Sequence, residues 1–459
     1  MKKIYLVLIA GCLSTMSMAN NIQLGNVTLN GQNTVSMFSL VNFDVSWENS
    51  WRTITNETNY DGAWLFVKFR KKTSTLWQHA TLNTTGSTVP AGSVLQTSLD
   101  GKGAWIYKAL PGADFTGNVN YTGAKLQWNY GVDGVLNTDS VEIRVFALEM
   151  VYVPAGAFKL GTGGAENSHF FEGGSNIPYS VASSGAITVS NTSPNLFYSG
   201  GGDAAGPIPA AFPKGFAAFW MMKYESSQQQ YVDFLNNLDL TRATNRNPLI
   251  FTGTHPNLVA PFPERAMNGL SIPDQAAFSD WAALRPFTEL EYEKACRGAN
   301  IVPLPNEYVW GSTSITPTTA VTNAGLDVET ANNGNANYGN NYNIMTRCGI
   351  YATGSSTRQT SGGSFYGIMD LGGNVAETCV GVGAPTSRTF TGVNGDGLLD
   401  AAGDANTPFW PIVSAAYALR GGYISAAATD LRTSDRINGS FTVFSRQIYI
   451  GVRVSRTAE

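Results

Sequence analysis

One acidic, glycine-rich stretch carries oxygen ligands that could hold a divalent cation. Residues 391–406 read TGVNGDGLLDAAGDAN, in which Asn394, Asp396, Asp400 and Asp404 supply amide and carboxylate oxygens at short intervals. Hard cations such as Ca²⁺ prefer these ligands. The spacing departs from the EF-hand pattern, and no Glu closes the loop at its end. The alternative is a solvated loop, because Asp-Gly and Asn-Gly pairs are ordinary turn residues.

Sulfur and imidazole groups are few and scattered. The three histidines lie far apart along the chain: His79, His169 and His255. A lone loop histidine is more often structural than a metal ligand. Cys296 falls in a predicted amphipathic helix and is expected to be a buried, inert thiol. Cys348 and Cys379 could form a disulfide in an oxidising compartment, and the sequence leaves that pairing open.

The composition indicates an extracytoplasmic protein. Charged residues make up 14% of the 459 residues, against the ~25% usual for soluble proteins, and the net charge is −4. Without a basic run, the chain has no electrostatic footprint for nucleic acid.

The N-terminus carries a targeting signal. Two lysines, the apolar run at residues 4–13 and a small-x-small site ending at Ala19 predict a signal peptide over residues 1–19. Secretion or display at the cell surface is therefore expected. A less favoured alternative uses Cys12 as a lipidated anchor. No later apolar run is long enough to span a membrane.

Residues 20–148 alternate between apolar and polar positions, as half-buried strands do. The clearest run is Val41, Phe43, Val45 and Trp47. Two others are Ala124, Leu126, Trp128 and Tyr130, and Val141, Ile143 and Val145. Asn-Gly and Asp-Gly turn pairs separate the runs. About seven short strands over this length predict an N-terminal all-β sandwich of the immunoglobulin or fibronectin type.

Residues 149–459 have a different, α+β character. Helices are predicted over residues 226–237, where apolar residues share one face, and from Pro273 onward. The third helix has the clearest signal, because Thr288 and Glu291 form a capping box. After residue 308 the periodicity fades into loops and short strands.

Seven segments of this second domain resemble, in order, the formylglycine-generating enzyme family, also called sulfatase-modifying factors. They are MVYVPAGAFKLG, FWMMKYESSQQQYVDFLN, RPFTELEYEKACRG, VWGS, YGIMDLGGNVAE, LRGG and GVRVSR, between residues 150 and 456. The resemblance implies a loop-rich domain with a C-type-lectin-like fold over residues 149–459. It bears less on function, because sites are set by particular residues rather than by the fold.

In active members of this family, two cysteines after the GG segment bind copper and oxidise a substrate cysteine to formylglycine. Aligned on Gly421-Gly422, the matching positions fall near Ala426 and Leu431, and residues 421–459 contain no cysteine. Because soft sulfur ligands suit Cu(I), neither copper nor the family's catalysis is expected, and no catalytic residue is assigned.

Two enzyme functions stay as alternatives. One is a copper-dependent cysteine oxidase of the formylglycine-generating type. The other is a divergent non-haem iron enzyme, since some relatives join sulfur to a histidine derivative with iron held by three histidines. The scattered histidines of this chain do not match that set.

The resemblance also implies structural calcium. In the family, the segment GNxWE helps to bind the ion. The matching residues are Gly373, Asn374, Val375 through its carbonyl, and Glu377, and a second family site would use Asn323. These are the oxygen types that Ca²⁺ takes. Ala376 stands where the family has Trp, and the alternative is that Asn374 only satisfies the backbone of a turn.

The segment after the GG pair lines the substrate groove in the family. The candidate groove residues here are Tyr423, Ser425, Arg432, Arg436 and Asn438. A structural role is the favoured interpretation of the two arginines, because Arg in loop-rich folds often binds backbone carbonyls or pairs with acids. A ligand groove is the functional alternative.

Together these features predict a secreted, non-catalytic binding or structural module. The expected partner is an extracellular protein or a glycan. Self-assembly is a further option, because exposed strand edges can pair with another chain.

Overall fold

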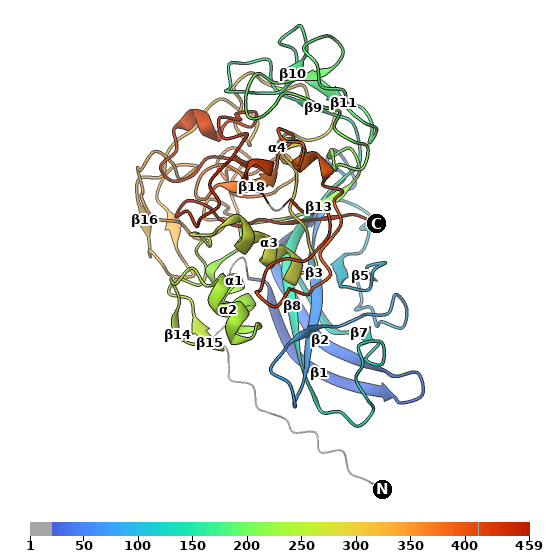
Figure 1. The fold of residues 1–459 in the computed structure, drawn as a ribbon. Coiled ribbons are helices and arrows are strands. Elements are labelled where there is room, and N and C mark those ends of the chain that lie inside the picture. The colour runs from blue at the N-terminus through green and yellow to red at the C-terminus, as the bar shows by residue number, and fades with distance from the viewer. Residues whose placement is uncertain (1–20, 412) are drawn as a thin grey trace.

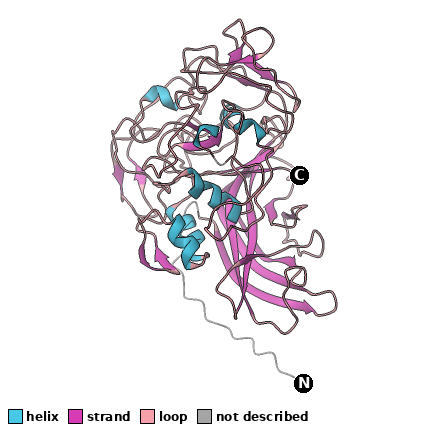
Figure 2. Cartoon of the chain, viewed as in Figure 1, coloured by secondary structure: helices cyan, strands magenta, loops and turns pink. Residues whose placement is uncertain are grey.

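The computed structural model describes residues 21–411 and 413–459 (Figure 1). The predicted signal peptide and Cys12 lie outside the described residues. Long strands gather at one end of the molecule, whereas loops make up most of the other end (Figure 2). Among the described residues, none of the helices combines the length and apolar character needed to cross a bilayer.

The N-terminal part of the described chain is built from strands. Their bounds are β1 Gln23–Asn33, β2 Phe38–Arg52, β3 Tyr60–Lys71, β4 Gln78–His79, β5 Ser93–Thr97, β6 Ala104–Lys108 and β7 Phe115–Trp128. Val41, Phe43, Val45 and Trp47 are buried in β2, while the residues between them are more exposed. The strands predicted from the apolar runs are therefore confirmed.

Two groups of these strands enclose one apolar core. Strand β2 pairs with β1 and β7, whereas β3 pairs with β4, β6 and β8 (Val141–Val153). The two groups join where Arg52 of β2 pairs with Tyr60 of β3. Phe43 of β2 and Leu126 of β7 share a cluster with Leu65 of β3 and Ile106 of β6. This packing is compatible with the predicted sandwich, and its immunoglobulin or fibronectin topology stays a prediction.

Strand β8 connects the N-terminal strands to the rest of the chain. It pairs with β3 from Lys71↔Val141 to Tyr60↔Tyr152, and so runs through the predicted boundary between residues 148 and 149. From Met150 onward its other edge pairs with β13 (Phe219–Met222), which in turn pairs with β20 (Ser455–Thr457). A single sheet thus passes from one part of the chain into the other (Figure 1).

Strand β3 is buried on both faces because it lies between two cores. Alternate residues face the N-terminal core: Ala63, Leu65, Val67 and Phe69. The residues between them face the C-terminal part, where Trp64 Nε1 donates a hydrogen bond to the Ala282 carbonyl at 2.8 Å. Lys68 Nζ donates to the carbonyls of Trp281 at 2.7 Å and Gly397 at 2.6 Å. Such a strand has a nearly continuous apolar sequence, here GAWLFVKF.

The C-terminal part combines short helices with small two-stranded sheets. The α-helices of the described residues are α1 Gln228–Asn236, α2 Leu240–Arg246, α3 Ile272–Trp281 and α4 Glu289–Arg297. The paired short strands are β9 Phe158–Leu160 with β11 Tyr179–Val181, β10 Phe171–Glu172 with β12 Leu196–Phe197, β14 Thr252–Thr254 with β15 Asn257–Val259, β16 Val321–Thr322 with β17 Thr330–Ala331, and β18 Glu377–Val380 with β19 Tyr417–Arg420. The β-rich character with few helices agrees with the fold class expected from the sequence.

The three predicted helices are confirmed as α1, α3 and α4. In α4, the Thr288 hydroxyl accepts from Glu291 N at 3.1 Å, and the Glu291 carboxylate accepts from Thr288 N at 2.9 Å, so the capping box forms. Helix α2 was not predicted. It begins after the three residues that follow α1, is capped by Asp239, and buries only Ala243.

Candidate functional site

The GG segment leaves β19 in a sharp turn. Arg420, the last residue of β19, lies opposite Glu377 of β18. Gly421 and Gly422 have φ angles of 80° and 68°. A Cβ on Gly421 would lie 2.5 Å from Glu377 Oε2, and one on Gly422 would lie 2.5 Å from Leu431 Cδ1. Only glycine fits both positions, and the turn brings the following loop back against the strand pair.

The two positions that match the family cysteines meet beside this turn. Leu431 lies against Gly422, and Ala426 Cβ is 3.4 Å from the place that a Cβ on Gly422 would take. Both side chains are buried in an apolar cluster that includes Tyr308 and Trp310. Hydrocarbon therefore lines the place where the resemblance puts sulfur ligands, and hydrocarbon offers no donor to a metal.

The thiols of the described residues are buried and free: Cys296, Cys348 and Cys379. Burial raises the pKa of each of them well above its ordinary value. Because the thiolate is the reactive and metal-binding form, these side chains are chemically quiet. The prediction of a buried Cys296 is confirmed, and Cys348 and Cys379 are not bridged.

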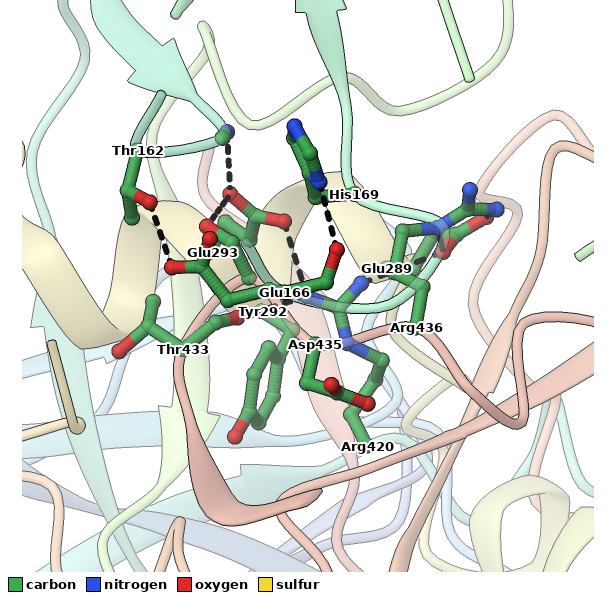
Figure 3. Close-up of polar contacts among 12 residues, drawn as sticks. Thr162, Glu166, His169, Glu289, Tyr292, Glu293, Arg420, Thr433, Asp435 and Arg436 are labelled. Carbon is green, nitrogen blue, oxygen red and sulfur yellow. Dashed lines mark hydrogen bonds and ion pairs between the residues drawn. The ribbon is translucent and has the colours of Figure 1, made fainter. Parts of the chain in front are cut away.

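Helix α4 directs two carboxylates into a buried charge network beneath the GG turn (Figure 3). Glu289, with no exposed surface, accepts hydrogen bonds from Arg436 Nε at 2.6 Å and Arg420 Nη1 at 3.2 Å. Glu293, one turn further on, accepts from Arg420 Nη2 at 2.8 Å and from the Ser434 hydroxyl at 3.0 Å. The network thus ties α4 to the GG segment and to the loop that follows it.

Ion pairing shifts the pKa values of Glu293 and Arg420 in the directions that favour their charged forms. Burial alone would raise the pKa of Glu293, but Arg420 and Arg297 outweigh burial and lower it. Burial likewise opposes the charge of Arg420, and Glu293 and Glu289 hold its pKa above the ordinary value. The network is therefore a set of paired ions, in which each charge depends on its partners.

Arg436 belongs to this network and not to an open groove. It is fully buried, with its guanidinium 4.0 Å from the Phe170 ring centroid. Its Nη1 donates to the carbonyls of Ser168 at 2.8 Å and Gly200 at 3.3 Å. Together with the bond to Glu289, these contacts are the structural role favoured from the sequence, and they leave Arg436 inaccessible to a ligand.

The loop over residues 162–169 lies against Asp435 and Arg436. Asp435 Oδ2 accepts hydrogen bonds from Asn167 N at 3.1 Å and Nδ2 at 2.8 Å. Glu166 Oε1 accepts from the Thr162 hydroxyl, and its backbone carbonyl lies 2.6 Å from His169 Nδ1 (Figure 3). These contacts fix the loop, so His169 acts as a structural histidine here.

The remaining groove candidates lie nearer the surface. Ser425 is exposed, whereas Arg432 and Asn438 are half-buried. Tyr423 stacks on Tyr449 with ring centroids 4.4 Å apart and an interplanar angle of 19°. A ligand groove formed by these residues stays a prediction.

The Asn374 turn, predicted to bind calcium, is buried and already bonded. Asn374 Oδ1 accepts from Thr346 N at 2.9 Å and from the Thr346 hydroxyl at 3.2 Å. Its Nδ2 donates to Glu225 Oε2 at 2.6 Å. Glu377 pairs with Arg453 at 3.2 Å. In this arrangement the amide oxygen has two donors and a guanidinium lies against Glu377 Oε1, whereas Glu377 Oε2 is buried without a hydrogen-bond partner among the described residues.

The other predicted calcium residues also take part in hydrogen bonds within the protein. Gly373 N donates to the Gly421 carbonyl at 2.8 Å, and Val375 N donates to Glu225 Oε1 at 3.1 Å. Asn323 lies in the β16–β17 loop, where its Nδ2 donates to the Val328 carbonyl at 3.5 Å. Within residues 21–411 and 413–459, no group of three or more His, Cys, Asp or Glu is placed to hold a metal. Calcium binding stays a prediction.

In the acidic loop, residues 391–406, the carboxylates accept hydrogen bonds from the backbone of the same loop. Asp396 Oδ1 accepts from Leu398 N at 2.8 Å, and Asp400 Oδ1 accepts from Asp404 N at 2.8 Å. Asp404 also pairs with Arg246 at 3.1 Å. These are the bonds of a turn-rich loop.

Asp280 of α3 and Thr457 of β20 also hold the acidic loop in place. The two carboxylate oxygens of Asp280 accept from the backbone N–H groups of Asp396 and Asn406, each at 3.0 Å. Asn394 Oδ1 accepts from Thr457 N at 3.4 Å. The contacts favour the alternative of a structural loop, and metal binding by Asn394, Asp396, Asp400 and Asp404 stays a prediction.

A buried cluster of ionisable side chains that the sequence did not predict lies where the two parts of the chain meet. Lys223 Nζ lies 3.0 Å from both Asp61 Oδ2 and Glu149 Oε2, and all three side chains are nearly inaccessible. Burial raises the pKa of Glu149 to about 8, although Lys223 opposes that shift. The available signal was a charged residue directly after an apolar strand, as in FWMMKYE, or within one, as in LEMVYV.

Comparison with known proteins assigns the family. Curated protein sequences contain no match to this chain. The family described as the sulfatase-modifying factor enzyme 1-like domain matches residues 144–458, well over half of the chain, starting within β8. The chain therefore belongs to the sulfatase-modifying factor family.

Proposed function

We propose that this protein is a secreted, non-catalytic member of the family that acts as a binding or structural module outside the cell. The observation that carries the proposal is the pair Ala426 and Leu431. Both are buried beside Gly422, where a copper oxidase of this family needs two thiolates.

The charged side chains near this place support the same proposal. Glu289, Glu293, Arg420 and Arg436 are paired with one another and buried. A general acid or base must reach a substrate proton within hydrogen-bond distance. These groups instead hold the GG segment and its following loop in place, which is the role of a scaffold.

A binding role accords with the composition, because an uncharged polar surface suits the extracellular setting predicted from the N-terminus. The partner is proposed to be an extracellular glycan or protein. Copies of the same chain are the alternative partner.

The test is an oxidation assay on purified mature protein. The protein is loaded with Cu(I) and given a cysteine-containing peptide and oxygen, and aldehyde formation is followed by mass spectrometry. The wild type is expected to bind copper at least about tenfold more weakly than the double variant Ala426→Cys/Leu431→Cys, which restores two soft donors beside Gly422. The wild type should form no aldehyde.

Conversion of the peptide thiol to an aldehyde by the wild type, with stoichiometric copper, would overturn the proposal. In that event Cys348→Ser and Cys379→Ser would show whether those thiols serve as donors. Their burial within separate apolar clusters predicts that neither does.

A further inference from the structure

A cleft opens where the N-terminal strands meet the family domain, away from the GG turn. Its volume is about 620 Å³, within the ~300–1,000 Å³ of typical small-ligand sites. One wall is the end of β2 with its connection to β3, and the other is the loop over residues 352–369. Lys223 and Tyr224, which follow β13, form part of the lining.

The two walls are joined by fixed contacts. Asn59 Nδ2 donates to the Tyr366 carbonyl at 2.8 Å, and Asn59 Oδ1 accepts from Trp51 Nε1 at 3.3 Å. Trp51 packs against Gly367, where a Cβ would come within 2.8 Å of the indole ring. The cleft is therefore formed before any ligand arrives, which reduces the ordering entropy that binding must overcome.

Both cations of the lining, Lys223 and Arg358, are hydrogen-bonded within the protein. Lys223 Nζ is bonded to Asp61 and Glu149, each at 3.0 Å, and lies 4.9 Å from the Trp51 ring centroid. Arg358 Nη2 donates to the carbonyls of Cys296 at 3.0 Å and Val309 at 2.8 Å. No carboxylate pairs with Arg358 among the described residues, but Glu57 also lines the cleft, and its negative charge opposes the binding of an anion.

The lining also presents two partly exposed aromatic side chains beside hydroxyl and amide groups. Trp51 and Phe365 are half-buried and keep part of their surface in the cleft. Hydroxyl and amide groups surround them, with Asn49, Thr353 and Thr357 exposed. Arg358 Nε is buried in the same wall without a hydrogen-bond partner among the described residues.

This combination matches one ligand class. A pyranose ring has a face of C–H groups, which the negative face of an aromatic ring attracts, and a rim of neutral hydroxyls that bond to amides and hydroxyls. We propose that the cleft between Trp51 and Phe365 binds a neutral saccharide. The inference goes beyond the proposed function, because it names a second site and a ligand class and would stand even if the GG turn proved catalytic.

The test uses saturation-transfer difference NMR and calorimetry on the mature protein. The probes are lactose, maltose, cellobiose and chitobiose at millimolar concentration, with glucuronic acid as the anionic probe and a capped Gly-Ser-Thr peptide as the peptide probe. At least one neutral disaccharide should bind, with saturation transfer strongest at the C–H protons of one ring face.

A matched pair of variants assigns the site. Gly354 lines the cleft and Gly112 lies in the connection between β6 and β7, and a Cβ on either would meet no atom within 4 Å. Gly354→Trp should fill the cleft and weaken the binding by about tenfold or more, whereas Gly112→Trp should leave it unchanged.

Three results would overturn the inference: no response from any neutral sugar, preference for the anionic or peptide probe, or equal binding by the wild type and Gly354→Trp. None of these results depends on aldehyde formation in the copper assay, so failure of the saccharide site and failure of the proposed function can be told apart.

Discussion

Replacing Glu289 by glutamine tests whether the buried charge network supports the loop after the GG turn. Glu289 accepts four hydrogen bonds: Val382 N at 2.8 Å, Arg436 Nε at 2.6 Å and Nη2 at 3.0 Å, and Arg420 Nη1 at 3.2 Å. Arg420 would keep Glu293 as a counter-ion. Arg436 would keep only backbone carbonyls, and so would become a buried cation without a counter-ion.

Breaking a buried pair on one side costs about 3–5 kcal/mol, because the remaining charge is left uncompensated. We expect Glu289→Gln to lower the free energy of unfolding by an amount in this range, measured by urea titration at constant pH. The matched control is Glu142→Gln. Its pair with Arg70 is about one-third exposed on each side, and such surface pairs contribute about 0–1 kcal/mol.

A second substitution distinguishes charge from packing. Arg436→Met added to Glu289→Gln removes the orphaned cation, and it should recover part of the lost stability. Hydrogen exchange in the loop around Arg436 should rise in the single variant and fall again in the double variant. A loss no larger than that of Glu142→Gln, or no recovery in the double variant, would refute the reasoning.

Two other predictions concern the junction between the two parts of the chain. Because burial raises the pKa of Glu149 from 4.5 to about 8, the folded state holds a proton that unfolding releases between these values, so stability should fall as pH rises through that window. Urea midpoints across the window should show a shallower decline for Glu149→Gln, and an unchanged decline would contradict the assignment. Gly367→Ala should lower stability by about 1–3 kcal/mol, because φ is 82° and a Cβ would come within 2.8 Å of Trp51. Gly354→Ala, measured by the same titration, should stay within about 0.5 kcal/mol of the wild type, and equal effects of the two would count against the described joint.

Local signals in the sequence were enough to predict many elements. The capping box of Thr288 and Glu291 is complete within four residues, so it could be recognised without knowing what α4 packs against. The alternation of Val41, Phe43 and Val45 likewise reports burial on one face of β2. Helix α2 was not predicted, because its seven residues bury only Ala243 and therefore show no periodic apolar pattern.

Long-range pairing was beyond these signals. Asn374 looks like a cation ligand or a turn residue from its neighbours alone. Its amide is bonded to Glu225, 149 positions earlier, and no local pattern encodes that contact. Arg436 is a similar case, since its role depends on Glu289, 147 positions away. Residue type restricts such a side chain to a few roles, and the tertiary fold selects among them.

The family segments and the cleft follow different physical requirements. In RPFTELEYEKACRG the charged side chains are directed inward: Arg285 pairs with Glu291 at 2.6 Å, and Lys294 Nζ donates to the Gly215 carbonyl. Changing any one of them would leave a buried charge or carbonyl unsatisfied, so these positions are constrained by stability. The exposed hydroxyls of the cleft, such as Thr353 and Thr357, bond only within their own loop, where water can replace either partner. Ligand preference can therefore change at the cleft while the charged scaffold beneath the GG turn stays the same.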